Sequence, residues 1–91
     1  MNMWTLVYAE AAAEQLGKLD RAVARRIQVY MDGVLGSGDP RSRGHSLSGP
    51  LSEYWRYRVG DYRVLVSIQD NQLTVVALRI GHRSMVYRDQ P

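Results

Sequence analysis

The sequence predicts an α+β fold with the element order β-α-α-β-β-β, in which a helical hairpin packs on one face of an antiparallel sheet. Two observations carry this prediction. Apolar residues recur at helical spacing through residues 9–35, whereas apolar and polar residues alternate at strand spacing through residues 54–80. The chain has 91 residues, enough for one hydrophobic core, so we expect a single domain over residues 1–91.

The first half predicts one strand and two helices. Residues 3–7 are rich in strand-forming side chains and predict the first strand. A short helix over 9–19 follows, with acidic residues in its first turns, where the helix dipole favours them. A second helix over 21–35 begins after Asp20, a good N-cap, and Gly36 can end it in the left-handed conformation.

The second half predicts three strands after one long loop. The loop covers 36–50 and is rich in glycine, serine and proline, as functional or flexible loops often are. Strands over 54–59 and 62–68 flank Gly60–Asp61, a two-residue hairpin signal. A strand over 73–80 follows a second turn.

The last strand, over 73–80, is apolar on both faces, which predicts a central position in the sheet. Simple alternation places Arg79 on the same face as Val75 and Ala77. The sequence thus predicts a sheet whose last strand is buried on both sides.

Composition excludes several classes of protein. The chain has no cysteine and two histidines far apart in sequence, so we expect neither a disulfide nor a metal site, and no cofactor. No segment approaches the roughly 18 consecutive apolar residues of a membrane span. The N-terminus lacks the basic flank and long apolar core of a signal peptide. These features predict a cytoplasmic protein without a membrane partner.

Charge is concentrated in the second half of the chain. Eleven of the twelve basic residues are arginine, and the net charge is +3. Residues 1–53 carry equal numbers of acidic and basic side chains, whereas residues 54–91 carry six arginines and three aspartates. This asymmetry indicates an anionic partner for the second half, although a solvated arginine-bearing face is an equally simple interpretation.

Arginines and aromatic residues share neighbouring strands in this half. By alternation, Arg56 and Arg58 lie on the same face as Tyr54, and Arg63 lies opposite or diagonal to Arg58 across the turn. Guanidinium groups grip phosphate bidentately, and tyrosine offers a face for base stacking. Crowded guanidiniums are best tolerated with an anion between them, so these residues predict an interface for the backbone of RNA or DNA.

Such a face suits a metal-free cleavage of RNA, in which the ribose 2′-OH attacks its own phosphate. Arginines can neutralise the charge that grows on phosphorus, but an arginine does not deprotonate. The proton transfers need other groups. Candidates are His82, Tyr87 and Tyr54, with His45 and Asp61 less favoured. Simpler interpretations stand beside these: the strand aromatics as packing residues, His82 as a surface histidine and Asp61 as a turn former.

Two segments resemble the signature of the RelE/ParE superfamily of bacterial and archaeal toxins. They are W-R-Y-R-V-G-D-Y-R-V-L-V, residues 55–66, and I-G-H-R-S-M-V-Y-R, residues 80–88. The predicted element order also fits, so the resemblance covers essentially the whole chain. It implies a type II toxin neutralised by a cognate antitoxin, which would cover the helical hairpin or a sheet edge in a hetero-oligomer.

The resemblance also implies an activity. RelE-like members cut mRNA in the ribosomal A site, whereas ParE-like members inhibit DNA gyrase without catalysis. By resemblance, Arg63 holds the scissile phosphate, Arg83 acts near the leaving oxygen and Tyr87 orients the nucleotide. This match favours the ribonuclease, with a gyrase inhibitor as the alternative and a non-toxic binding partner as a third hypothesis.

One position departs from the RelE pattern. RelE toxins commonly carry lysines, one of them the general base, where this chain has Arg56 and Arg58. Some relatives use a histidine late in the chain, and the resemblance gives that role to His82; the alternatives are a slow toxin or a different target. RNA binding is assigned to Arg56, Arg58, Tyr54 and the loop residue Arg43.

Overall fold

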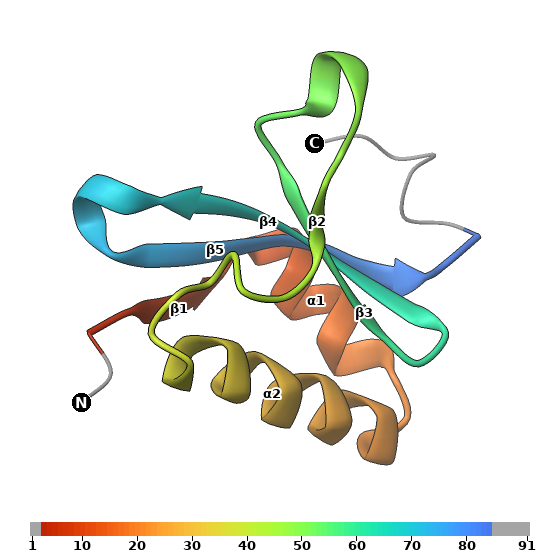
Figure 1. Ribbon diagram of the computed structural model, residues 1–91. Coiled ribbons are helices and arrows are strands. Elements are labelled where there is room, and N and C mark those ends of the chain that lie inside the picture. Colours follow the sequence, from red (N-terminus) through yellow and green to blue (C-terminus); the bar gives the residue numbers. More distant parts are fainter. Residues whose placement is uncertain (1–2, 85–91) are drawn as a thin grey trace.

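The structure is a computed structural model that describes residues 3–84, so Tyr87 lies outside the described residues. Two helices lie on one face of a five-stranded sheet (Figure 1), which confirms the α+β fold with its helices on one side of the sheet. Among the described residues, no helix has the length and apolar character needed to cross a bilayer.

The N-terminal elements are β1 (Thr5–Tyr8), α1 (Glu10–Lys18) and α2 (Arg21–Gly36), within one or two residues of the predicted bounds. Asp20 caps α2 as expected, because its carboxylate accepts the Ala22 N–H at 3.1 Å. The predicted position of the left-handed glycine after α2 was wrong. Gly36 is the last residue of α2, but the left-handed glycine is Gly38, with φ 84°.

The remaining elements are β2 (His45–Ser46), η1 (Gly49–Leu51), β3 (Trp55–Val59), β4 (Tyr62–Gln69), η2 (Asp70–Gln72) and β5 (Thr74–His82). The Gly60–Asp61 turn joins β3 to β4, with Gly60 at φ 62°. The segment over 36–50, predicted as a loop, contains the short strand β2.

The sheet order is β1-β5-β4-β3-β2. The pairs β2–β3, β3–β4 and β4–β5 are antiparallel, but β1 pairs with β5 in parallel, so the sheet is mixed rather than antiparallel throughout. No turn connects β1 to β5, so no local signal in the sequence determines their relative direction. β5 is hydrogen-bonded on both sides, as its two apolar faces predicted, although β4 holds the middle position.

The hydrophobic core lies between the helices and one face of the sheet. From α2, Ile27, Met31 and Val34 are fully buried, and they belong to one cluster with the sheet residues Tyr57, Val59, Val64, Val66, Val75, Ala77 and Ile80. Burial of the larger aliphatic side chains among these, at about 1.5–3 kcal/mol each, is the main stabilising contribution to the fold. The alternate residues of β3, β4 and β5 therefore point to the other, helix-free face.

A β-bulge changes which face Arg79 occupies. Leu65 is opposite Arg79 while Val66 is opposite Ala77, so Leu78 is an extra residue in β5. The extra residue reverses the alternation, and Arg79 lies across from Leu65 on the helix-free face. The prediction that Arg79 shares a face with Val75 and Ala77 was wrong for this reason.

Candidate nucleic-acid interface

Four arginines lie on the helix-free face of the sheet. Arg56 and Arg58 alternate with the buried residues of β3, Arg63 is opposite Arg58 on β4, and Arg79 joins them from β5. Residues directly opposed across strands project from the same face. We call Arg56, Arg58, Arg63 and Arg79 the arginine face. The sequence predicted that Arg56, Arg58 and Arg63 lie together, whereas the position of Arg79 depends on the bulge in β5.

Arg63 is held by the backbone of the nearby turn. Its Nη1 donates to the carbonyls of Gly60 and Tyr62, each at 3.2 Å. Two cations, Arg58 and Arg63, therefore stand at the end of the sheet where β3 turns into β4. The two ion pairs recorded within residues 3–84, Lys18–Glu14 and Arg41–Asp70, lie elsewhere. This end of the sheet therefore carries two adjacent positive charges, of which Arg63 is held in place by the backbone, and such a pair suits an anion.

A buried apolar residue lies within the arginine face. Leu65 is paired with Arg56 on one side and Arg79 on the other, and it is 1% exposed although it lies outside the main core cluster. The two arginines flank it and are themselves only partly exposed. Their aliphatic stems can pack along an apolar surface while the guanidinium groups stay at its edge.

The end of β5 brings Arg83 close to the β3–β4 turn. The Arg83 N–H donates to the Asp61 carbonyl at 2.8 Å, which extends the β4–β5 pairing by one residue. The Arg83 side chain is exposed. Arg83 and Arg63 therefore lie at the same end of the sheet, as the sequence-based site requires.

His82 leaves the sheet on the opposite side from the arginine face. It is paired with Tyr62, and the two rings meet edge-to-face with centroids 5.9 Å apart. The next pair on the same face of the sheet, Val64 with Ile80, belongs to the core. The structure therefore does not bring His82 to the same face as Arg63.

His45, the less favoured histidine, lies on the side of the arginines. It is directly opposite Arg56 in the β2–β3 pair, and its side chain is exposed. The sequence contained no signal for this position, because β2 is a two-residue strand within a segment of loop composition.

The two remaining predicted RNA-binding residues are placed differently. Tyr54 directly precedes β3 and is half-buried, and its carbonyl accepts the Leu47 N–H at 3.2 Å. Arg43 lies over the ring of Tyr30 on α2, with its guanidinium carbon 5.4 Å from the ring centroid. Arg43 is therefore directed toward the helix and away from the arginine face.

Aromatic side chains fasten the segment between α2 and β2 to the rest of the fold. The indole N–H of Trp4 donates to the Gly38 carbonyl at 3.2 Å, and that of Trp55 donates to the Arg43 carbonyl at 2.7 Å. The Tyr57 hydroxyl donates to the Pro40 carbonyl, and burial raises the pKa of this phenol well above its usual range. These contacts position β2 against β3.

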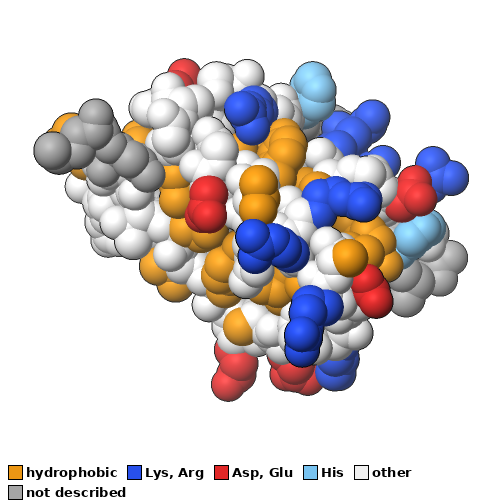
Figure 2. Space-filling model, turned by 90° about the horizontal axis from the view of Figure 1, so that it is seen from below, with side chains coloured by type: hydrophobic (Ala, Val, Ile, Leu, Met, Phe, Trp, Pro, Cys, Tyr) orange, Lys and Arg blue, Asp and Glu red, His pale blue; other side chains and the backbone are white. Residues whose placement is uncertain are grey.

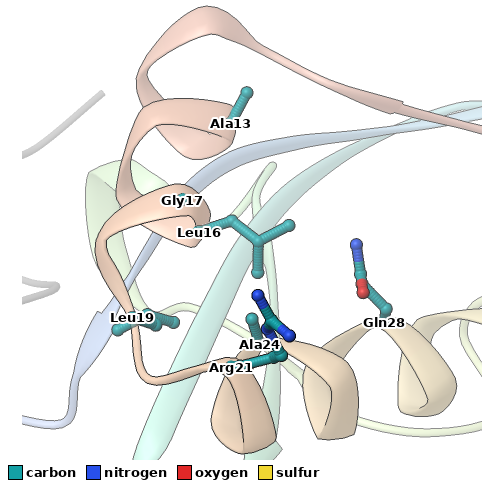
Figure 3. A pocket seen from close by; sticks show the side chains of 7 residues that line it. All are labelled: Ala13, Leu16, Gly17, Leu19, Arg21, Ala24 and Gln28. Carbon is teal, nitrogen blue, oxygen red and sulfur yellow. The ribbon is translucent and has the colours of Figure 1, made fainter.

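The helix side has a different surface. A hollow of about 470 Å³ lies between α1 and α2, lined by Ala13, Leu16, Gly17, Leu19, Arg21, Ala24 and Gln28. Figure 3 shows Leu16 pointing into the space between the two helices. On the side of the molecule seen in Figure 2, basic and acidic side chains are interspersed with hydrophobic ones, so this side lacks the single-sign charge of the arginine face.

Comparison with known proteins shows the family. The family model of the ParE toxin of type II toxin–antitoxin systems matches residues 6–87. Toxin RelG of Mycobacterium tuberculosis is 33% identical over 85 residues, which cover 93% of this chain and 97% of that protein.

Solved structures agree. The toxin–antitoxin complex RelBE2 of M. tuberculosis contains a chain that superimposes with a TM-score of 0.79 at 28% identity, covering 88% of this chain and 98% of that chain. The isolated RelE toxin of E. coli shares the fold, with a TM-score of 0.72 at 18% identity over 87% of this chain and 83% of that chain. The chain therefore belongs to the RelE/ParE superfamily of toxins of type II toxin–antitoxin systems.

Proposed function

We propose that this toxin is an endoribonuclease that cleaves mRNA on the ribosome in the cytoplasm and so inhibits translation. The observation that carries the proposal is the arginine face, where Arg58 and Arg63 are directly opposed and Arg83 lies at the same end of the sheet. The Arg63 guanidinium, held by two backbone carbonyls before substrate binds, can stabilise the charge of a phosphorane without reorganising. The reaction then needs no metal ion.

The proposed roles follow from these positions. Arg63, fixed by two carbonyls, holds the scissile phosphate. Arg83 acts near the leaving 5′-oxygen, and Tyr87, outside the described residues, orients the nucleotide. Arg56 and Arg58 bind the neighbouring phosphates.

Two further residues complete the proposed RNA contacts. Tyr54 stacks a base beside β3, and Arg43 binds RNA from the loop once it leaves Tyr30. The sequence favoured His82 for taking the 2′-OH proton, and this residue lies on the far side of the sheet from Arg63.

A cognate antitoxin is the proposed protein partner, in a toxin–antitoxin hetero-oligomer. The related chain from M. tuberculosis was solved in a complex with an antitoxin. The hollow between α1 and α2, lined by small and apolar residues together with Arg21 and Gln28, suits an amphipathic antitoxin helix. An acidic extended segment would then neutralise the arginine face and block the site.

Primer extension on a defined mRNA tests the proposal. The message is translated in a purified system with the toxin, and the same message without ribosomes is the control. We expect cuts only where ribosomes are present. Substituting Arg63→Ala should slow cleavage by about 100-fold or more, as loss of one charge-stabilising donor does in other enzymes.

Arg25→Ala is the matched control variant, because Arg25 is an exposed arginine on α2, across the molecule from the arginine face. It should cleave at the wild-type rate. Full cleavage by the Arg63→Ala, Arg83→Ala double variant would contradict the proposal.

The second candidate function is inhibition of DNA gyrase. Two observations favour it: the matching family model is that of ParE toxins, and the β3 positions 56 and 58 hold arginines, which do not accept protons. This function predicts double-strand DNA breaks in cells that make the toxin, while their mRNA stays uncut. Pulsed-field electrophoresis of the DNA, run beside primer extension, separates the two functions.

A further inference from the structure

The two histidines of this chain lie on opposite faces of the sheet. His45 is paired with Arg56 of the arginine face. His82 is paired with Tyr62, and the next pair on that face of the sheet, Val64 with Ile80, belongs to the core. Only His45 therefore shares a face with the arginines.

Hydrogen bonding also distinguishes the imidazole of His82 from that of His45. The Ser84 N–H donates to Nδ1 of His82 at 3.3 Å, and the Ser84 hydroxyl lies 3.0 Å from the same nitrogen. A neutral imidazole that accepts at Nδ1 carries its proton on Nε2. In that tautomer the lone pair of His82 that could take a proton lies at Nδ1, where Ser84 already hydrogen-bonds.

His45 stands at one end of a row that crosses four strands. The row runs from His45 through Arg56 and Leu65 to Arg79, each directly opposite the next. Neighbouring strands are about 4.8 Å apart, so one strand spacing separates the His45 backbone from that of Arg56. Arg58 and Arg63 form the adjacent row. The two rows are next to each other, so the exposed His45 at the β2 edge lies on the same face as this arginine pair.

The position of β2 is fixed by tight packing just before His45. A Cβ on Gly44 would lie 2.3 Å from the Arg56 carbonyl oxygen and 2.8 Å from Trp55 Nε1. The backbone of residue 44 thus lies directly against β3. His45 is presented from a firmly packed strand, although its own side chain is exposed.

We propose that His45 is the general base of the cleavage reaction, an inference that rests on the proposed function. The neutral imidazole takes the proton of the ribose 2′-OH as that oxygen forms a bond to phosphorus. The bond from phosphorus to the 5′-oxygen breaks, and this oxygen leaves with the bonding electrons and takes a proton from water. The products are a 2′,3′-cyclic phosphate and a 5′-OH, and the imidazolium returns its proton to water.

Single-turnover cleavage of mRNA on ribosomes, with toxin in excess, tests this role. His45→Gln keeps a polar side chain of similar size but takes no proton, so we expect cleavage to slow by about 100-fold or more. Binding to ribosomes carrying a 2′-deoxy nucleotide at the cleavage position should be unchanged, because no proton is transferred there. Arg25→Ala, the exposed α2 variant, is the control and should cleave at the wild-type rate, whereas His82→Gln tests the competing assignment and should lose far less of the rate than His45→Gln.

A second variant distinguishes proton transfer from a structural effect. His45→Ala should recover part of its cleavage rate when free imidazole is added, whereas an altered fold would not respond. Wild-type cleavage rates in His45→Gln, or a loss confined to His82→Gln, would overturn the assignment while leaving the nuclease intact. A wild-type toxin that cuts no mRNA would overturn the nuclease and the base together.

Discussion

Arg58 and Arg63 are directly opposite each other across β3 and β4, next to the turn at Gly60–Asp61. Like charges in this arrangement repel, and a pair without an anion between its members reduces the stability of the fold. The cost is tolerable at a site that binds a phosphate, because the bound anion reverses the sign of the interaction. Stability and the proposed function are therefore in conflict at this pair.

Removing one charge of the pair should stabilise the fold and weaken RNA binding. Arg58→Gln is expected to raise the free energy of unfolding by about 0.2–1 kcal/mol, the range for cross-strand pairs. Arg58→Lys, which keeps the charge, should show no such gain. Urea unfolding measures both variants. Adding phosphate should stabilise the wild type more than Arg58→Gln, and equal responses would show that the pair binds no anion.

Two tyrosines should respond oppositely to the same substitution. The Tyr8 hydroxyl is buried and has no hydrogen-bond partner among the described residues, and burial, with a smaller effect of Asp32, raises its pKa. Tyr8→Phe removes this unpaired group and should stabilise the protein by about 1 kcal/mol.

Tyr57→Phe is the matched comparison. It leaves the Pro40 carbonyl without its donor and should cost about 1–3 kcal/mol. The same urea titration measures both variants, and a loss of stability in Tyr8→Phe equal to that in Tyr57→Phe would contradict the expected difference.

The bidentate pair of Arg41 and Asp70 should make stability depend on acid pH. The two guanidinium nitrogens donate to the carboxylate at 2.9 and 3.0 Å, and this hydrogen bonding lowers the pKa of Asp70 below its ordinary value of 3.8. A lowered folded-state pKa stabilises the protein above the unfolded-state value, and this stabilisation is lost as the pH falls through the folded-state pKa.

The measurement is the melting temperature of wild type and Asp70→Asn as a function of pH. Near neutral pH the wild type should melt higher, and the difference should disappear on acidification below the ordinary aspartate value. Arg41→Gln, which removes the other partner, should show the same convergence. A difference in melting temperature between wild type and Asp70→Asn that persists at acid pH would mean that the ion pair is not the cause of the difference.

Gly44 should tolerate no side chain. Its φ is 78°, and an added Cβ would lie 2.3 Å from the Arg56 carbonyl oxygen. Gly38 is the control, because it is also left-handed, at φ 84°, but has nothing within 4 Å of an added Cβ. Gly38→Ala should cost about 1–2 kcal/mol from the backbone alone. Gly44→Ala should cost more, and should also reduce cleavage because β2 carries His45. Equal costs at the two glycines would mean that β2 is loosely packed.

Much of the fold was predictable because its signals are local. Apolar spacing predicted both helices and the strands of the C-terminal half, Asp20 marked the start of α2, and Gly60–Asp61 marked the β3–β4 turn. Each of these depends on residues a few positions apart in sequence. The same turn placed Arg63 opposite or diagonal to Arg58, and the structure shows the direct pairing, with the register set by the two-residue hairpin.

The sequence by itself thus determined the elements, the turn and the concentration of arginine in the second half. Only the tertiary structure decided that β1 runs parallel to β5, that the bulge at Leu78 turns Arg79 to the helix-free face, and that His45 rather than His82 lies beside the arginines. These depend on hydrogen bonds between strands distant in sequence. Strand register places a side chain on one face or the other, and a shift of a single residue reverses that choice.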